Sequence, residues 1–316
     1  MHMGIVVVGP VFVDIKGFPL GTFIQNGRNS GEVETVHGGI SRNIVEDIAN
    51  VELRPTFLSL VDDTGTGEDV IKKLNNHKVD TRYIKRVKDG MGIWLAVFNN
   101  EGDVVASISK RPDFIEIERT IDEFGEEIFK DCDSITVEID IEPSTIKKII
   151  ALAKKYNKKV YGAVSNMSIA VDHRDLFKDF ECIVCNIEEA ELLFSEDYSR
   201  KTPSQMSQII LDNIIAAKIP SMVVTMGENG AVYASVSGVC GVMPSMKVNV
   251  IDTTGAGDAF FSGVAMGLTY GKDLKGACEI GTRLAACVIQ SIENVCPRFL
   301  PEEFGLKKWF GLPSLT

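Results

Sequence analysis

Residues 252–258 read Asp-Thr-Thr-Gly-Ala-Gly-Asp, and an apolar stretch beginning Ala259-Phe260-Phe261 follows them. Small residues before such a stretch predict a tight turn that opens a buried helix. The first N–H groups of a helix have no partner within it and lie at its positive end. The backbone of Gly255, Ala256 and Gly257 would therefore form an anion pocket, with Asp258 at its edge.

A carboxylate in that place would repel a phosphate that merely binds there. It makes chemical sense if Asp258 takes a proton from a hydroxyl group that attacks a phosphate. The segment therefore predicts phosphoryl transfer, with Gly255, Ala256, Gly257 and Asp258 as the catalytic candidates. The alternative is a capped helix after an ordinary glycine turn.

Composition places the chain among soluble globular proteins. It has 316 residues, 45% hydrophobic and 24% charged, and a net charge of −11. An acidic chain is a poor partner for nucleic acid, which needs clustered Lys and Arg. We expect no transmembrane helix or signal peptide, since no apolar run approaches ~18 residues. Seven cysteines without disulfide-like spacing favour a reducing cytoplasm.

Short β-rich runs alternate with helical patterns, which predicts an α/β fold with a mainly parallel sheet. The predicted strands are Ile5–Val8, Thr56–Val61, Ser134–Val137, Lys159–Val164, Cys182–Cys185 and Ser221–Thr225. The predicted helices are Ile40–Asn50, Glu68–Asn76, Glu142–Tyr156, Ile187–Phe194, Ser204–Lys218, Ala256–Leu268 and Leu274–Ser291.

Two segments interrupt the alternation, residues 11–37 and 91–112. The first has strand-like ends around a Gly/Asn-rich middle. The second is typical of a hairpin, Gly92–Phe98 and Val104–Ser109, around a turn rich in Asn, Gly and Asp. We expect the two segments to pair as a small β lid on a single domain covering residues 1–316.

A second glycine site lies at His37-Gly38-Gly39-Ile40-Ser41-Arg42-Asn43. Gly38 and Gly39 would let the backbone approach a ligand at the start of a helix, and Asn43 would present an amide one turn later. Asp14 could bind neighbouring hydroxyl groups from the other side. The alternative is a strand-to-helix turn, with Asp14 as a turn residue.

Two further sites follow predicted strands. Asn186 and Glu189 have the spacing of a capping box, and they could instead hold phosphates and water-coordinated Mg²⁺. Thr225, Gly227 and Gly230 form a glycine turn suited to the phosphates or ribose of a nucleotide; the alternative is a hairpin turn leading to Ala231–Ser235.

Other motifs are weaker. Residues 63–68 are Gly-rich but lack a Walker lysine and a G-x-G-x-x-G pattern, so they predict a strand-to-helix turn. Cys182 and Cys185 form a single pair in an apolar strand, which disfavours zinc. Gly9-Pro10-Val11 after the first strand offers no dinucleotide fingerprint, which disfavours a dehydrogenase.

The four glycine-and-carboxylate sites, in this order and spacing, resemble the PfkB or ribokinase-like family of small-molecule kinases. The similarity runs from Val6 to about Val295. Residues 252–258 look like the C-terminal signature of that family, and Gly38-Gly39-x-x-x-Asn43 looks like its N-terminal one. The resemblance implies a three-layer α/β/α fold with a β-sheet lid.

It also implies residue roles. Asp258 would be the general base, and Gly255, Ala256 and Gly257 the anion hole. The substrate's hydroxyl groups would bind Asp14, Gly38, Gly39 and Asn43. ATP would bind Asn186, Glu189, Thr225, Gly227 and Gly230, with Mg²⁺ held by Glu189 through water. In some members the residues equivalent to Asp252 and Thr254 bind a monovalent cation, usually potassium.

The resemblance leaves the substrate open. A kinase acting on the exocyclic hydroxymethyl group of a sugar or ribonucleoside is the leading hypothesis. Arg42 and Val164-Ser165 look like pseudouridine kinases, but Gly162-Ala163 depart from that pattern. Glu138, Asp140, Lys110 and Arg111 are further candidates for substrate contact.

Two alternatives remain. The first is a vitamin kinase of the hydroxymethylpyrimidine or pyridoxal type, which usually lacks the early lid. The second is a catalytically silent ligand-binding regulator, which the intact Asp258 disfavours. The lid is also a candidate surface for a homodimer, since an exposed sheet would leave an apolar face in water.

Overall fold

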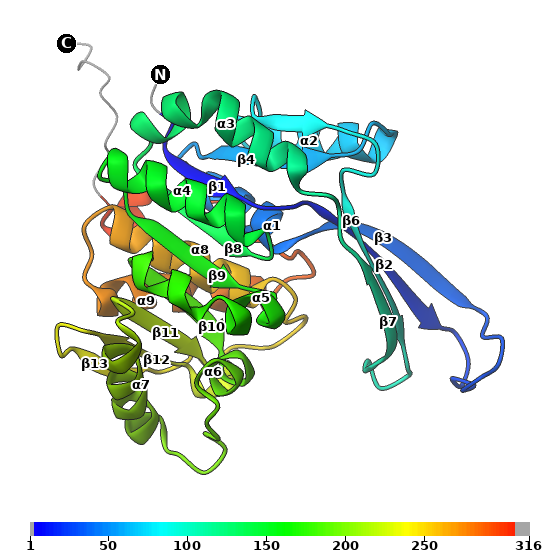
Figure 1. Cartoon of the computed structure of the whole chain (residues 1–316). Coiled ribbons are helices and arrows are strands. Elements are labelled where there is room, and N and C mark those ends of the chain that lie inside the picture. Colours follow the sequence, from blue (N-terminus) through cyan, green and yellow to red (C-terminus); the bar gives the residue numbers. More distant parts are fainter. Residues whose placement is uncertain (1–2, 307–316) are drawn as a thin grey trace.

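A nine-stranded sheet forms the centre of the protein in the computed structural model, which describes residues 3–306 (Figure 1). Neighbouring strands are parallel except at one edge, where β12 is antiparallel to both of its neighbours. The spatial order is β13 (Cys240–Met243), β12 (Ala231–Ser235), β11 (Ser221–Thr225), β10 (Cys182–Asn186), β9 (Val160–Val164), β8 (Ser134–Ile139), β1 (Ile5–Val8), β4 (Thr56–Val61) and β5 (Ile84–Arg86).

The six strands predicted from the sequence are all confirmed, to within two residues at each end. Every residue of β1, β4, β8 and β9 is buried. Strands covered on both faces carry nearly continuous apolar runs, and such runs are easily found in a sequence.

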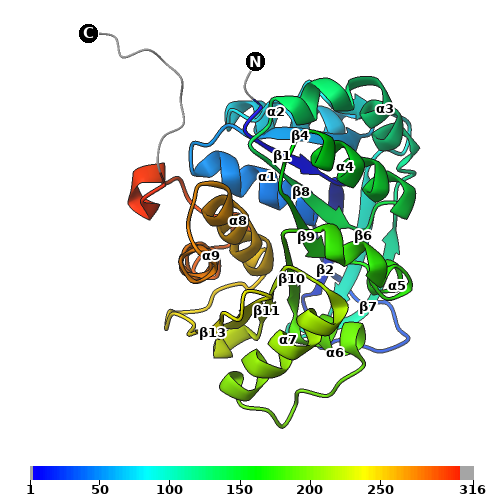
Figure 2. The same cartoon turned by 60° about the vertical axis from the view of Figure 1, so that its left-hand side comes forward.

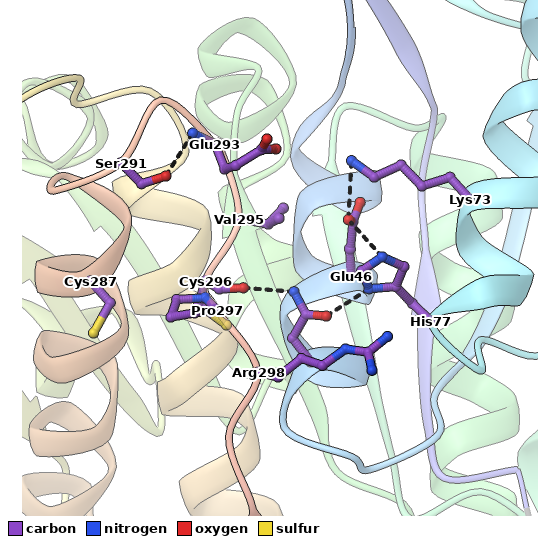
Figure 3. Close-up of a pocket in the computed structure, with 11 residues that line it drawn as sticks. Glu46, Lys73, His77, Cys287, Ser291, Glu293, Val295, Cys296, Pro297 and Arg298 are labelled. Carbon is purple, nitrogen blue, oxygen red and sulfur yellow. Dashed lines mark hydrogen bonds and ion pairs between the residues drawn. The ribbon is translucent and has the colours of Figure 1, made fainter.

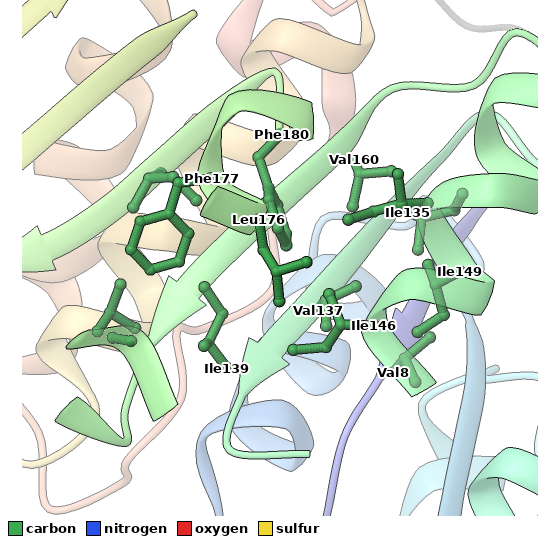
Figure 4. Close-up of a cluster of buried hydrophobic side chains, with 14 of the residues drawn as sticks. Val8, Ile135, Val137, Ile139, Ile146, Ile149, Val160, Leu176, Phe177 and Phe180 are labelled. Carbon is green, nitrogen blue, oxygen red and sulfur yellow. The ribbon is translucent and has the colours of Figure 1, made fainter. Parts of the chain in front are cut away.

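Helices cover both faces of this sheet, as Figure 2 shows. Alternate residues of a strand face opposite sides, so Val6 and Val8 belong to one apolar core while Ile5 and Val7 belong to the other. Figure 4 shows the first core, in which β8 packs against α4 and the segment around Phe177. That face is covered by α3 (Ile115–Lys130), α4 (Pro143–Lys155), α5 (Met167–Asp172), α6 (Ile187–Phe194) and α7 (Pro203–Ala217). The other face is covered by α1 (Ile40–Asn50), α2 (Gly65–Asn76), α8 (Ala256–Thr269) and α9 (Leu274–Val288).

Within the described range, no helix has the length and apolar character needed to cross a membrane.

Helix α3 was not among the sequence predictions. Its buried residues include Ile117, Ile121, Ile128 and Phe129, at helical spacing. Charged residues fill most positions between them, so the segment reads as an exposed, polar stretch. Its apolar face is recognised only when every third or fourth residue is compared. All seven helices that were predicted are confirmed, and their ends differ from the prediction by up to three residues.

Four strands form the lid sheet, in the order β3 (Gly31–Gly38), β2 (Phe12–Pro19), β6 (Gly92–Phe98) and β7 (Val104–Lys110). Strands β2 and β6 are parallel to each other, which joins the two predicted segments. The sheet extends away from the main body (Figure 1). The predicted pairing of residues 11–37 with the 91–112 hairpin is therefore confirmed.

The chain order reverses at β1, which lies between β4 and β8. In open α/β sheets, ligands bind outside the carboxyl ends of the strands at such a reversal. Gly9 follows β1, and a side chain on it would lie 2.0 Å from Ser41 Oγ and 3.0 Å from Glu138 Cβ. This close approach brings the start of α1 against the end of β8, where the site is built.

Helices α8 and α9 cross at two glycines. A methyl group on Gly263 would lie 2.5 Å from the Cα and N atoms of Gly281. Because those are backbone atoms, Gly263→Ala must push the helices apart. We expect a loss of about 1–3 kcal/mol in the free energy of unfolding, measured by urea denaturation.

Gly65→Ala is the matched control. Gly65 is the first residue of α2, and nothing lies within 4 Å of the added methyl group. We expect little change or a small gain in stability. Equal losses in the two variants would contradict the packing argument.

Candidate active site

The predicted glycine turn begins α8 as the sequence indicated. Gly255 is left-handed, with φ of 81°, and a side chain there would lie 2.0 Å from the Asn294 carbonyl oxygen. The turn also uses one predicted amide, because the Ala256 N–H donates to the Thr253 carbonyl at 3.2 Å. The expectation of three free N–H groups therefore needs correction at Ala256. The space beside Gly257 is open, since a side chain on it would meet no described atom within 4 Å.

Asp258 lies in the first turn of α8 and accepts a hydrogen bond from Asn43 Nδ2 at 2.6 Å. The residue is partly exposed, but its carboxyl group lies deep among protein atoms. Desolvation raises the pKa of Asp258 to about 7, and the Asp14 charge adds to this. Asn43 and Arg42 act in the opposite direction. A carboxyl group with a pKa near neutrality suits proton transfer at physiological pH.

Asp14 and the two glycines form the wall beside Asp258. A side chain on Gly38 would lie 2.3 Å from Asp14 Oδ2, so the carboxylate occupies the space over Gly38. Gly39 caps α1 with φ of 98°, and its carbonyl accepts the Asn43 N–H. Burial raises the pKa of Asp14, although Lys16 and Arg42 lower it. The structure thus brings four of the predicted substrate residues, Asp14, Gly38, Gly39 and Asn43, to one corner.

Two more carboxyl groups, those of Glu138 and Asp140, lie at the end of β8. Glu138 Oε2 accepts hydrogen bonds from the Ser41 N–H (3.0 Å) and hydroxyl (2.7 Å). Burial raises the pKa of Glu138 to about 8. Asp140 pairs with Arg111 Nε at 3.0 Å and accepts from Asn166 Nδ2 at 2.7 Å. Arg111 directly follows the lid, so this pair ties the lid to the central sheet.

Lys110, the other basic candidate, does not join this group. Its ammonium group pairs with Asp89 at 2.8 Å, and both side chains are exposed at the base of the lid.

Sequence reasoning missed Asp47, which lies one turn after Asn43 on α1. Its carboxyl group is fully buried and accepts from the Cys296 N–H at 2.7 Å and the Ser262 hydroxyl at 3.3 Å. Burial raises the pKa of Asp47 to about 8, and the Asp258 charge contributes. Its position four residues after Asn43 was the available signal, since such residues share a helix face.

The predicted nucleotide residues lie at the ends of β10 and β11, which are paired in register at Asn186 and Thr225. Asn186 and Glu189 form a reciprocal capping box, with two hydrogen bonds of 2.8 Å. Gly227 and Gly230 both have positive φ in the turn between β11 and β12. The structural alternatives, a cap and a hairpin turn, are therefore both present.

Asp252 and Thr254 form a local turn, because Asp252 Oδ1 accepts the Thr254 N–H at 2.8 Å. Both residues line a cavity of about 550 Å³, whose other walls are lid strands β2 and β3, Lys73 of α2 and residues 292–294. Burial would raise the pKa of Asp252, but the Thr254 hydrogen bonds and the Lys16 charge outweigh it and lower the pKa.

The donor sets can be compared with what each cation requires. Among the described residues, no three or more His, Cys, Asp or Glu side chains are arranged to hold a metal ion. Mg²⁺ fits this arrangement when it is held through water and phosphates, since it keeps several waters and needs one or two carboxylates. The Glu189 carboxylate uses Oε2 in the capping box and retains Oε1. The lowered pKa of Asp252 keeps its carboxylate ionised, as a ligand of a monovalent cation would need to be.

A model of the pfkB family of carbohydrate kinases matches residues 3–295. The chain belongs to the pfkB carbohydrate kinase family. It is 34% identical to a guanosine-inosine kinase of Exiguobacterium acetylicum, over 92% of this chain and 95% of that protein. It is 21% identical to a ribokinase of Schizosaccharomyces pombe, over 91% and 92% of the two chains.

The fold agrees with solved members of the pfkB family. The Arabidopsis thaliana ribokinase solved with ribose and ATP superposes with a TM-score of 0.80 at 19% identity, over 94% of this chain and 96% of that one. The protein is thus an ATP-dependent sugar or nucleoside kinase of the pfkB family. These relatives do not specifically support the resemblance to pseudouridine kinases, because the 34% identical relative is a guanosine-inosine kinase.

Asp47 gives a test of the buried acids. Its folded pKa of about 8 exceeds the ordinary value of 3.8, so the folded state holds more protons than the unfolded state between these pH values. Stability from this group is therefore present at low pH and is lost as pH rises toward 8, by up to about 1.4 kcal/mol per pH unit. Asp47→Asn keeps an acceptor for Cys296 and removes the titration.

We expect the free energy of unfolding of the wild type, relative to Asp47→Asn, to fall between pH 5.5 and 7.5 in urea titrations. Glu138 and Asp258 are present in both proteins, so the difference between the curves reports on Asp47 and on its coupling to Asp258. Parallel curves across this range would contradict the raised pKa.

Proposed function

We propose that the protein transfers the γ-phosphoryl group of ATP to the exocyclic hydroxymethyl group of a purine ribonucleoside of the guanosine or inosine type. The proposal depends chiefly on Asp258, a carboxyl group with a pKa near 7 that Asn43 holds beside a glycine turn. The similarity to a guanosine-inosine kinase across nearly the whole chain supports the choice of substrate. The four-stranded lid disfavours the vitamin-kinase alternative.

In the proposed reaction, Asp258 removes the proton of the hydroxyl group. The hydroxyl oxygen forms a bond to the γ-phosphorus, the bond from that phosphorus to the β–γ bridging oxygen breaks, and ADP leaves. Ionised Asp258 is the active form, so the rate should fall as the pH drops below about 7.

The glycine turn supplies the other contribution. Backbone N–H groups of Gly255 and Gly257 at the positive end of α8 would stabilise the charge that builds on the phosphoryl oxygens. Mg²⁺, held through water by Glu189, would neutralise charge on the β- and γ-phosphates, and Asn186, Thr225, Gly227 and Gly230 would position the nucleotide. Asp252 and Thr254 would hold a monovalent cation next to the turn.

The substrate's hydroxyl groups would bind the acidic corner opposite the turn. Asn43 donates a hydrogen bond to Asp258, the Asp14 charge acts on Asp258, and Glu138 and Asp140 lie at the end of β8. Carboxylates accept hydrogen bonds from sugar hydroxyls, and they disfavour a phosphorylated substrate by charge repulsion. This corner therefore suits a neutral, hydroxyl-rich acceptor.

Replacement of Asp258 tests the reaction. In Asp258→Asn the amide oxygen still accepts from Asn43, but no base remains. We expect kcat to fall at least ~100-fold, while ATP affinity measured by calorimetry changes little. Asp252→Asn is the control in the same turn, and it should alter the dependence on K⁺ more than it alters kcat at saturating K⁺. Near-normal turnover of Asp258→Asn would rule out the proposed base.

A coupled assay of ADP release tests the substrate. The panel is guanosine, inosine, adenosine, pseudouridine, ribose and fructose, with and without K⁺. We expect the highest kcat/KM with guanosine or inosine, and 5′-deoxyinosine should release no ADP. Higher kcat/KM with ribose or fructose would overturn the choice of a nucleoside while leaving the kinase assignment in place.

A further inference from the structure

Arg42 is a charged side chain with almost no access to solvent, at 1% exposure. It lies on α1 directly before Asn43, which binds Asp258. Burying a guanidinium group is costly unless hydrogen bonds and an opposite charge compensate it. The partners of Arg42 therefore indicate what the burial achieves.

The guanidinium group is held from two sides. Its Nη1 donates to Glu46 Oε2 at 2.6 Å, one turn further along α1, and its Nη2 donates to the His37 carbonyl at the end of β3. The Nε atom is buried and has no hydrogen-bond partner among the described residues. Arg42 thus joins lid strand β3 to α1, on either side of the turn formed by Gly38 and Gly39.

Glu46 is itself contacted by Lys73 of α2 and by His77, which caps that helix. Figure 3 shows Lys73 and His77 pointing toward its carboxylate, with Oε1 at 3.2 Å from Lys73 Nζ and 3.7 Å from His77 Nε2. Burial would raise the pKa of Glu46, but Arg42 and Lys73 outweigh it and lower the pKa. Glu46 is therefore ionised at neutral pH and keeps Arg42 in one orientation.

The His37 carbonyl connects this pair to the glycine turn. It also accepts a hydrogen bond from Asn294 Nδ2 at 3.2 Å. The backbone of Asn294 packs against Gly255, where no side chain would fit. One carbonyl group thus links Arg42, the lid strand and the segment that supports the turn.

Arg42 also brings positive charge to an acidic neighbourhood. The charged and polar groups that face Asp258 are Asp14 on β2, Arg42, Asn43 and Asp47 on α1, and Glu138 on β8. Three of these are acids, and Arg42 is the cation. Its charge opposes their effect and favours ionised Asp258, which is the form a base requires.

We propose that Arg42, oriented by Glu46, is a positioning residue for phosphoryl transfer. It fixes the turn at Gly38 and Gly39 through the His37 carbonyl and places a positive charge among the acids that face Asp258. The proposal rests on the function proposed above for Asp258. A buried ion pair that only stabilises the fold is the alternative. The two differ in what they predict for the titration of Asp258.

Three variants separate charge from structure. Arg42→Met removes the charge, so the pKa of Asp258 should rise by about one unit and kcat/KM at pH 6.5 should fall about tenfold or more. Arg42→Lys keeps the charge but not the planar fork, so the pKa should stay near that of the wild type while kcat falls. Glu46→Gln leaves Arg42 charged, so the pKa of Asp258 should stay or fall.

The titration of Asp258 is measured in the substrate-free protein by carboxyl ¹³C NMR, with Asp258→Asn identifying the signal, and the acid limb of kcat/KM is measured in parallel. His77→Gln is the matched control, since His77 contacts the same Glu46 carboxylate from the end of α2. The Asp258 titration and the acid limb of this variant should match the wild type. Urea denaturation of every variant checks folding.

A rise in the Asp258 pKa in Arg42→Met, without a rise in Glu46→Gln, would support the proposal. An unchanged pKa in all variants, with or without lost stability, would overturn it. If the Asp258 pKa rises but the acid limb of kcat/KM does not follow, the function proposed for Asp258 fails instead. Should Arg42→Met not fold, a higher pKa in Glu46→Gln than in the wild type would still contradict the charge assignment.

Discussion

The hydrogen bond between Asn43 and Asp258 joins two helices whose residues are 215 positions apart in the chain. Each helix begins at a glycine with positive φ, Gly39 for α1 and Gly255 for α8. The 2.6 Å contact requires both helix starts to meet at the carboxyl edge of the central sheet. The glycine at each start allows the approach, because a side chain on either would collide with backbone atoms.

The electrostatics of the site follow from that meeting point. Asp47, Glu138 and Asp258 are brought within range of one another, and burial raises the pKa of each to between about 7 and 8. Several acids in one buried region cannot all ionise without a compensating charge. Hydrogen bonds from Asn43, Ser41 and Cys296 offset part of the cost, and Arg42 supplies a fixed positive charge.

The lid shares this corner with the catalytic candidates. Strand β3 ends at Gly38, one residue before α1 is capped, and Arg111 ties the end of β7 to Asp140 on the central sheet. A small movement of the lid would therefore displace the residues proposed to bind the substrate. Closure over a substrate would exclude water and limit hydrolysis of ATP.

The sequence by itself determined the elements whose signal is local. Continuous apolar runs identified the six buried strands, and short glycine-and-acid motifs predicted sites at Asp252–Asp258 and Gly38–Asn43. Helix α3 was missed because charged residues separate its apolar residues, which line up on one face only at the helical period. The Asn186–Glu189 spacing predicted a capping box equally well, and that cap is present.

Only the tertiary structure decided which distant groups meet. Arg42, Asp47 and Asn294 have no motif of their own, and their importance comes from partners far away or on the hidden face of a helix. The use of the Ala256 amide inside its own turn also depends on the final backbone path. The sequence thus predicted a type of chemistry for residues 252–258, because a turn's glycines and carboxylates lie close along the chain. The pKa of Asp258 was left to the fold, because burial and opposing charges act through space.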